Sequence, residues 1–177
     1  MSLIEITPDD PKELLAPTEF PVIPPGTHVF VVANNLAITD TSPTDGSTPK
    51  QMISIEARCQ DEDENKGMVV FDNILIISKS MIDNEPDPAK AEKLAKAKAI
   101  HDKKLTQFAL ACGVVTKEEV ETSGLKIESL DDFNQRTFKA VTAVRMENVY
   151  PPEFDANGNA LKRKRASIKR YLFEAEG

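Results

Sequence analysis

The order of hydrophobic patterns along the 177-residue chain limits its possible folds more than any other feature. Three segments rich in β-branched and apolar residues come first, over residues 27–39, 52–60 and 68–77. A long helical pattern over 86–112 follows, and two further β-type segments lie at 138–150 and 162–174. This order predicts a mainly β protein whose longest helix connects the third strand to the fourth.

Alternation within the second β-type segment predicts which of its side chains face the core. Ile53, Ile55, Ala57 and Cys59 alternate with a second set that includes Arg58, as in a half-buried strand. The polar stretches at 41–50 and 61–67 separate the first three strands, which we expect to form an antiparallel meander. Five strands with a helix between strands 3 and 4 follow the order of the OB-fold, a five-stranded barrel, so we predict that fold.

The helical segments carry their own start and stop signals. Asp87 can cap the long helix, Pro88 suits its first turn, and Gly113 lies where a C-terminal cap belongs. Thr116 and Glu119 have the spacing of a capping box, which predicts a second, short helix ending near residue 124.

The proline-rich first 24 residues predict an extended N-terminal arm, followed by one OB-fold domain over 25–177. The N-terminus lacks a basic start and an apolar core, and no stretch approaches the roughly 20 apolar residues that span a bilayer. We therefore expect a cytoplasmic protein without a membrane segment. Cys59 and Cys112 form no CxxC pair, which argues against a disulfide framework or a zinc site.

Charge is distributed unevenly along the chain. The formal net charge is −7, which by itself argues against a simple polycation that coats nucleic acid. Acidic residues crowd the N-terminus and the run at 61–64, whereas a run of cations, Lys162 to Arg165, is followed closely by Lys169 and Arg170. The sequence therefore predicts a local basic pole near its end.

Single-strand binding requires two kinds of side chain. Cations contact the phosphates along the strand, and flat side chains stack on the bases. Regular alternation of the last strand would place Arg165, Lys169 and Tyr171 on one face, and Arg170 inward near the rim. The candidate DNA-binding residues are Arg58, Phe71, Arg145, Tyr150, Lys162, Arg163, Lys164, Arg165, Lys169 and Tyr171.

Each candidate has a purely structural alternative. The basic run can instead be a solvated hairpin end that guards an edge strand against aggregation. Aromatic residues in strands commonly pack in the core or across strands. Arg58 and Arg145 can pair with Glu56 and Glu147 rather than line a groove, and these alternatives stay open at this point.

Catalytic and metal-binding signatures are absent from the sequence. The acidic run at 61–64 lacks the spacing of a calcium loop and fits a solvated turn, and His28 and His101 are isolated. The chain has no Walker A loop, no GxSxG elbow, no kinase set, no zinc-deaminase signature and no Gly-Asp-Pro pyrophosphatase motif. We expect no enzymatic activity, no catalytic residue, no cofactor and no metal.

Several segments together resemble a family of small phage single-stranded-DNA-binding proteins with OB-folds. The similarity covers residues 24–173 and rests on PPGTHVFVV, GMVVFDNILI, LTQFALACGV, LDDFNQRTFKAVTAV and RASIKRYLF. Related sequences often have glycine before the fourth strand, where this chain has Asn134, Gln135 and Arg136.

The resemblance implies a protein that coats transiently exposed single strands during replication or recombination, in the cytoplasm of an infected bacterium. Other replication or recombination proteins are its expected partners, and self-association into a homo-oligomer stays open. The rival hypothesis is an OB module that binds no nucleic acid and docks an acidic protein through its basic pole.

Overall fold

Six antiparallel strands form one sheet in the computed structural model, which describes residues 5, 21–43 and 49–173. The strands are β1 (Gly26–Val32), β2 (Ala37–Asp40), β3 (Gln51–Cys59), β4 (Val69–Ile76), β5 (Thr137–Asn148) and β6 (Lys162–Leu172). Their order is β2-β3-β1-β5-β6, and β4 also pairs with β3. The mainly β class is confirmed, as is burial of Ile53, Ile55, Ala57 and Cys59 on one face of β3.

The helices are α1 (Lys79–Asp83), α2 (Pro88–Ala111) and α3 (Lys117–Ser123), with a short 3-10 turn at Leu130–Phe133. Asp87 accepts a hydrogen bond from the Ala89 N–H at the start of α2, and Thr116 with Glu119 completes a capping box on α3. Both predicted caps are therefore confirmed, and α2 connects β4 to β5.

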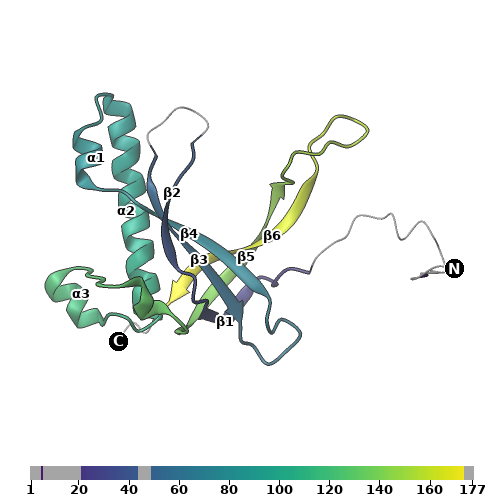
Figure 1. The fold of residues 1–177 in the computed structure, drawn as a ribbon, viewed down its shortest axis with the longest axis horizontal. Helices are drawn as coiled ribbons and strands as arrows, with labels where there is room; N and C mark the ends of the chain where they lie inside the picture. Colours follow the sequence, from purple (N-terminus) through teal and green to yellow (C-terminus); the bar gives the residue numbers. More distant parts are fainter. Residues whose placement is uncertain (1–4, 6–20, 44–48, 174–177) are drawn as a thin grey trace.

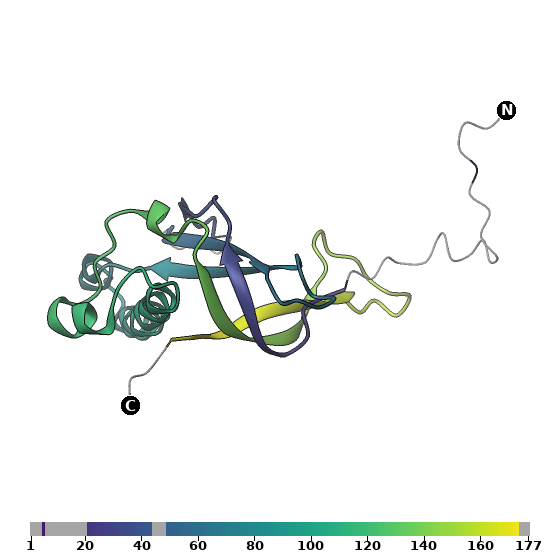
Figure 2. The same cartoon turned by 90° about the horizontal axis from the view of Figure 1, so that it is seen from below.

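The helices lie at one end of the sheet, and the β5–β6 hairpin projects from the other (Figures 1 and 2). Helices of the length and apolarity that a bilayer crossing requires do not occur among the described residues.

The first strand predicted over 27–39 is two strands in the structure. β1 and β2 both pair with β3, but residues 33–36 turn away between them. The Asn35 side-chain amide donates to Glu56, and the Asn34 side chain accepts from Gln135, so both asparagines hydrogen-bond outside the ladder. Gln135 occupies the left-handed region, with φ of 59°, directly before β5.

The closed five-stranded barrel is not what the structure shows, because the sheet has six strands and stays open. No backbone ladder joins β4 to β6 in the described part of the chain. Side chains connect the two strands instead: the Tyr171 hydroxyl donates to Asp72 over 2.6 Å, and Lys104 of α2 contacts the same carboxylate. Phe108 of α2 packs against Tyr171, so the helix covers this seam.

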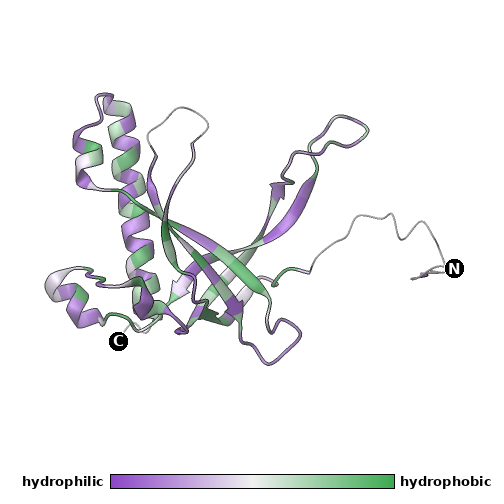
Figure 3. Ribbon diagram, in the orientation of Figure 1, coloured by the Kyte–Doolittle hydropathy of each residue, from purple (hydrophilic) through white to green (hydrophobic). Residues whose placement is uncertain are grey.

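The core is built around an aromatic cluster. Phe108 stacks on Phe133 with ring centroids 4.9 Å apart, and Phe138 contacts both Phe108 and Phe30. Apolar colour concentrates on the central strands, whereas the outer part of β6 is hydrophilic (Figure 3). Ile23 is also buried in this core, so the domain includes at least the end of the segment predicted as the arm over 1–24. Most of that segment lies outside the described residues.

Candidate functional site

Within the described part of the chain, exposed apolar and basic side chains gather on the outer half of the β5–β6 hairpin. We call residues 145–165 the distal hairpin, because Ala166, opposite the half-buried Val144, is the last buried residue and the strands continue beyond this pair. It contains five lysines and arginines against three carboxylates, within a chain whose net charge is −7. A local excess of positive charge therefore projects from an acidic protein.

The tip of the distal hairpin is held by its own hydrogen bonds. Leu161 N donates to the Glu153 carbonyl over 2.7 Å, and Phe154 forms a bridge with Ala160. The Asp155 carboxylate accepts from the backbone N–H groups of Asn157 and Asn159, and these bonds lower the pKa of Asp155. The tip therefore presents its side chains from an ordered turn.

Four of the seven large apolar side chains that are exposed among the described residues belong to the distal hairpin. Tyr150 is 85% exposed and Phe154 63%, and the other two exposed side chains of the hairpin are Met146 and Leu161. Exposed large apolar side chains that gather on one element make that element a candidate contact surface. Tyr150 was predicted from the sequence, but Phe154 was not. Its signal was an aromatic residue inside a loop rich in proline, asparagine and glycine.

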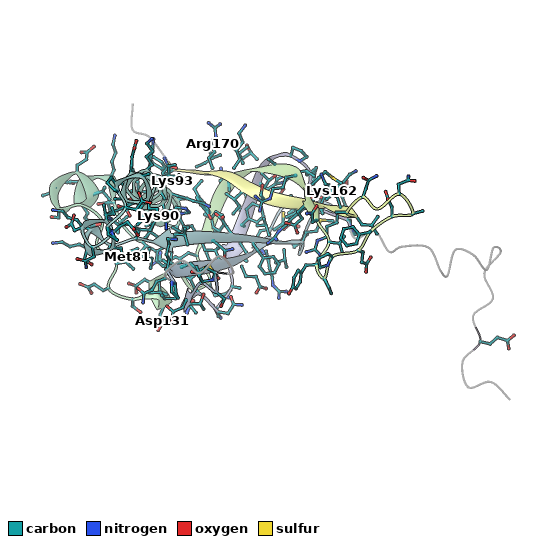
Figure 4. All side chains as sticks on the ribbon, turned by 90° about the horizontal axis from the view of Figure 1, so that it is seen from above. Met81, Lys90, Lys93, Asp131, Lys162 and Arg170 are labelled. Atoms are coloured by element: carbon teal, nitrogen blue, oxygen red, sulfur yellow. The ribbon has the colours of Figure 1, made fainter. Side chains whose placement is uncertain are left out.

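The basic run is divided between the two faces of the ribbon. Lys162 and Lys164 lie opposite Asn148 and Met146, whereas Arg163 and Arg165 lie opposite Glu147 and Arg145. Because successive side chains of a strand point to opposite faces, the run forms a lysine face and an arginine face rather than one patch. Lys162 is labelled on the hairpin in Figure 4, well apart from Arg170 on the same strand.

The two faces differ in electrostatic pairing. Lys162, Lys164 and Arg145 form no ion pair with any described residue. Glu147 accepts hydrogen bonds from Arg163 and Arg165, so the predicted alternative of an Arg145–Glu147 pair does not occur. Burial alone would raise the pKa of Glu147, but the two arginines outweigh it and hold that pKa below its usual range.

A β-bulge at Lys169 overturns part of the predicted strand. Thr142 pairs with Ile168 and Val141 with Arg170, so Lys169 is an extra residue without a partner on β5. The alternation therefore reverses beyond the bulge: Tyr171 points into the core, and Arg170 is exposed together with Lys169. The prediction that Tyr171 contacts DNA is wrong, because its ring is buried among Phe108 and Phe138. The inward position predicted for Arg170 is wrong for the same reason.

Arg58 and Phe71 lie together on the outer face of β3 and β4. Phe71, half exposed, is opposite Glu56, and Arg58 is the next residue on that face. The Arg58 guanidinium also approaches Glu56, with 3.8 Å between Nη2 and Oε1. β1 separates β3 from β5 in the sheet, so the structure forms two groups, Arg58 with Phe71 and the distal hairpin, rather than one.

The acidic run at 61–64 has one structural role that the sequence did not reveal. Asp61 accepts hydrogen bonds from the Val29 N–H and from His28 Nδ1, whose Nε2 faces the Pro24 carbonyl. The Val29 N–H lowers the pKa of Asp61 most, burial opposes it, and His28 adds to the lowering. Asp61 therefore fastens the turn after β3 to the start of β1.

His28, Asp61 and the buried thiol of Cys59 also form a group with metal-binding donor types. His28 Nδ1 and Asp61 Oδ2 are only 2.6 Å apart, whereas two ligands of a tetrahedral zinc ion are separated by about 3.3 Å. The distance fits a hydrogen bond, so this group acts as a clamp between strands rather than as a ready metal site.

An open hollow of about 940 Å³ lies beside the end of α2, lined among others by Cys112, Lys117 and Lys139. Burial raises the pKa of the Cys112 thiol to about 12, so it is not a thiolate at neutral pH. Lys117 and Lys139 share this lining with Glu118 and Glu121, so its formal charges balance. The distal hairpin remains the more distinctive surface.

Comparison of the chain with protein-family models, with curated proteins and with solved structures gave no match.

Proposed function

We propose that this protein binds single-stranded nucleic acid, without catalysing a reaction, through the distal hairpin. The observation that carries the proposal is the combination, on one hairpin, of exposed Tyr150 and Phe154 with three cations, Arg145, Lys162 and Lys164, that form no ion pair with any described residue. Unpaired bases stack on exposed rings, and nearby cations neutralise the phosphates between them. Duplex DNA offers no free base faces, so it lacks the first of these interactions.

The connection order of the strands supports the same function. β1 and β2 together take the place of the first OB strand, and β3, β4, α2, β5 and β6 then follow in OB order. We propose that the sheet is an OB-fold barrel whose last seam is closed by side chains. OB-folds commonly grip single strands with the strand 2–3 face and the 1–2 and 4–5 loops. In this assignment Arg58 and Phe71 lie on that face, and the distal hairpin is the 4–5 loop.

The sequence resemblance to phage single-stranded-DNA-binding proteins points in the same direction. It supports a role in coating strands exposed during replication or recombination, with little sequence preference. Backbone electrostatics and stacking require no base-specific hydrogen bonds.

A titration with fluorescent oligo-dT at two salt concentrations tests the proposal, with oligo-rU and a duplex of equal length in parallel. We expect oligo-dT to bind much more tightly than the duplex, and the affinity to fall by a log–log slope of about −0.7 per phosphate contact. The oligo-rU titration shows whether DNA is preferred over RNA. Equal affinity for single strand and duplex would contradict the stacking model.

A protein-binding module is the second candidate function. Met146 and Leu161 are exposed on the distal hairpin, and aliphatic side chains suit a protein partner at least as well as a base. Absence of any salt-sensitive binding to oligo-dT would favour this function.

A further inference from the structure

The arginine face of the distal hairpin contains two guanidinium groups directed at one carboxylate. Arg163 Nε and Nη2 each lie 3.1 Å from Glu147 Oε1. Arg165 Nη1 lies 3.3 Å from the same oxygen and 3.2 Å from Oε2. The three residues come from paired strands: Arg163 is opposite Glu147, and Arg165 is two residues further along the same face.

This geometry is suitable for a phosphate as well as for a carboxylate. The planar guanidinium fork matches the oxygens of both anions, and two forks that converge on one point form a defined anion position. The position is open to solvent, since the side chains of Glu147, Arg163 and Arg165 are 22%, 57% and 36% exposed. Arg145, directly opposite Arg165, adds a third guanidinium to the same face.

We propose that Arg163 and Arg165 form a phosphate-binding site, and that Glu147 occupies it in the free protein as an internal competitor of the nucleic-acid backbone. The inference rests on the proposed function, because the ligand is a backbone phosphate of a single strand. The phosphate displaces the carboxylate from the two guanidinium groups, and no covalent bond changes.

The competition has a consequence for both affinity and salt dependence. Each phosphate that an arginine neutralises releases condensed cations from the nucleic acid, but the displaced Glu147 carboxylate attracts a cation in turn, so the net release and the salt slope are reduced. Breaking the Glu147 contacts also costs free energy, and this cost weakens the binding of the nucleic acid. Glu147 remains ionised at neutral pH, since the arginines lower its pKa, and it therefore competes under ordinary binding conditions.

The Glu147→Gln variant tests the inference, with Glu153→Gln as its matched control. Both changes remove one negative charge from the distal hairpin, but Glu153 forms no ion pair with any described residue and is exposed. We expect Glu147→Gln to tighten oligo-dT binding by roughly three- to tenfold and to steepen the log–log salt slope by up to about 1.4. Glu153→Gln should give only the smaller gain that comes from a less negative hairpin.

A second variant shows whether the gain passes through the two arginines. Adding Arg163→Ala and Arg165→Ala to Glu147→Gln should remove the increase in affinity and in slope. Thermal unfolding of each variant checks that the hairpin stays folded. If the wild type binds oligo-dT but Glu147→Gln and Glu153→Gln have equal effects on affinity and slope, the competitor role of Glu147 is overturned. The proposed function then stays intact. Absence of oligo-dT binding by both the wild type and Glu147→Gln overturns both proposals.

Discussion

The Tyr171 hydroxyl donates a 2.6 Å hydrogen bond to the Asp72 carboxylate, joining β6 to β4 where the described residues form no backbone ladder. Lys104 of α2 contacts the same carboxylate, also over 2.6 Å. One acidic side chain on β4 therefore connects the last strand and the long helix to the first half of the sheet. Burial and the Asp72 charge together raise the pKa of Tyr171, so the phenol remains a donor.

Replacing Tyr171 with Phe removes this hydrogen bond while keeping the buried ring. We expect a loss of about 1.5–3 kcal/mol in the free energy of unfolding, because the bond is to a charged, partly buried group. Urea unfolding measures the loss. The matched control is Tyr150→Phe, which changes the same atom on a side chain that is 85% exposed and should leave stability unchanged. Equal stability of the two variants would show that the seam does not depend on this bond.

Removing the exposed rings of the distal hairpin should weaken binding without unfolding the protein. We expect Tyr150→Ala and Phe154→Ala each to cost about 1–3 kcal/mol of binding free energy to oligo-dT, because each ring stacks on a base. Ile100→Ala on α2 is the control, since Ile100 is 65% exposed but lies on a helix outside the distal hairpin. The measurement is fluorescence anisotropy, with thermal unfolding in parallel. Unchanged affinity in both aromatic variants would remove these rings from the binding surface.

The lysine face should account for part of the salt dependence of binding. Replacing Lys162 and Lys164 together by Ala should reduce the log–log salt slope by about 1.4, or about 0.7 for each lost phosphate contact. The control pair is Lys90→Ala with Lys93→Ala, because these exposed lysines lie on α2, away from the hairpin that carries Lys162 (Figure 4). An identical reduction in the control pair would mean that only overall charge matters, and not the hairpin.

Asp61 should contribute stability that is lost in acid. Its pKa is lowered in the folded state, so the unfolded chain takes up the proton first as the pH falls. The contribution is present above the unfolded pKa, about 3.9, and disappears as the pH falls through the lower folded value. Relative to wild type, Asp61→Asn should lose about 1.5–3 kcal/mol at pH 6, and the difference should shrink towards pH 3.

Urea unfolding at several pH values measures this effect. Glu64→Gln is the control, because Glu64 belongs to the same acidic run but is exposed. A difference between wild type and Asp61→Asn that does not change with pH would contradict the assigned role of the carboxylate.

The long helix, its cap and most strands could be predicted from the sequence because they depend on neighbouring residues, whereas the division of the first strand into β1 and β2 and the helix α1 were not predicted. The alternation around Ile53 and Ile55 reflects the two faces of a single strand, and the Asp87 cap needs only the next two residues. The concentration of cations after residue 161 is likewise a local property. These features identify a mainly β chain with one long helix and a basic hairpin.

The tertiary structure alone decided which of those side chains are available for binding. One extra residue at Lys169 reverses the two faces of β6, buries Tyr171 and exposes Arg170, and a period-2 pattern cannot reveal a bulge. The bond from Tyr171 to Asp72 joins residues 99 positions apart, and the contacts of Glu147 with Arg163 and Arg165 depend on the register of two strands. Such relationships arise from the packing of distant segments, whose relative placement no local pattern contains.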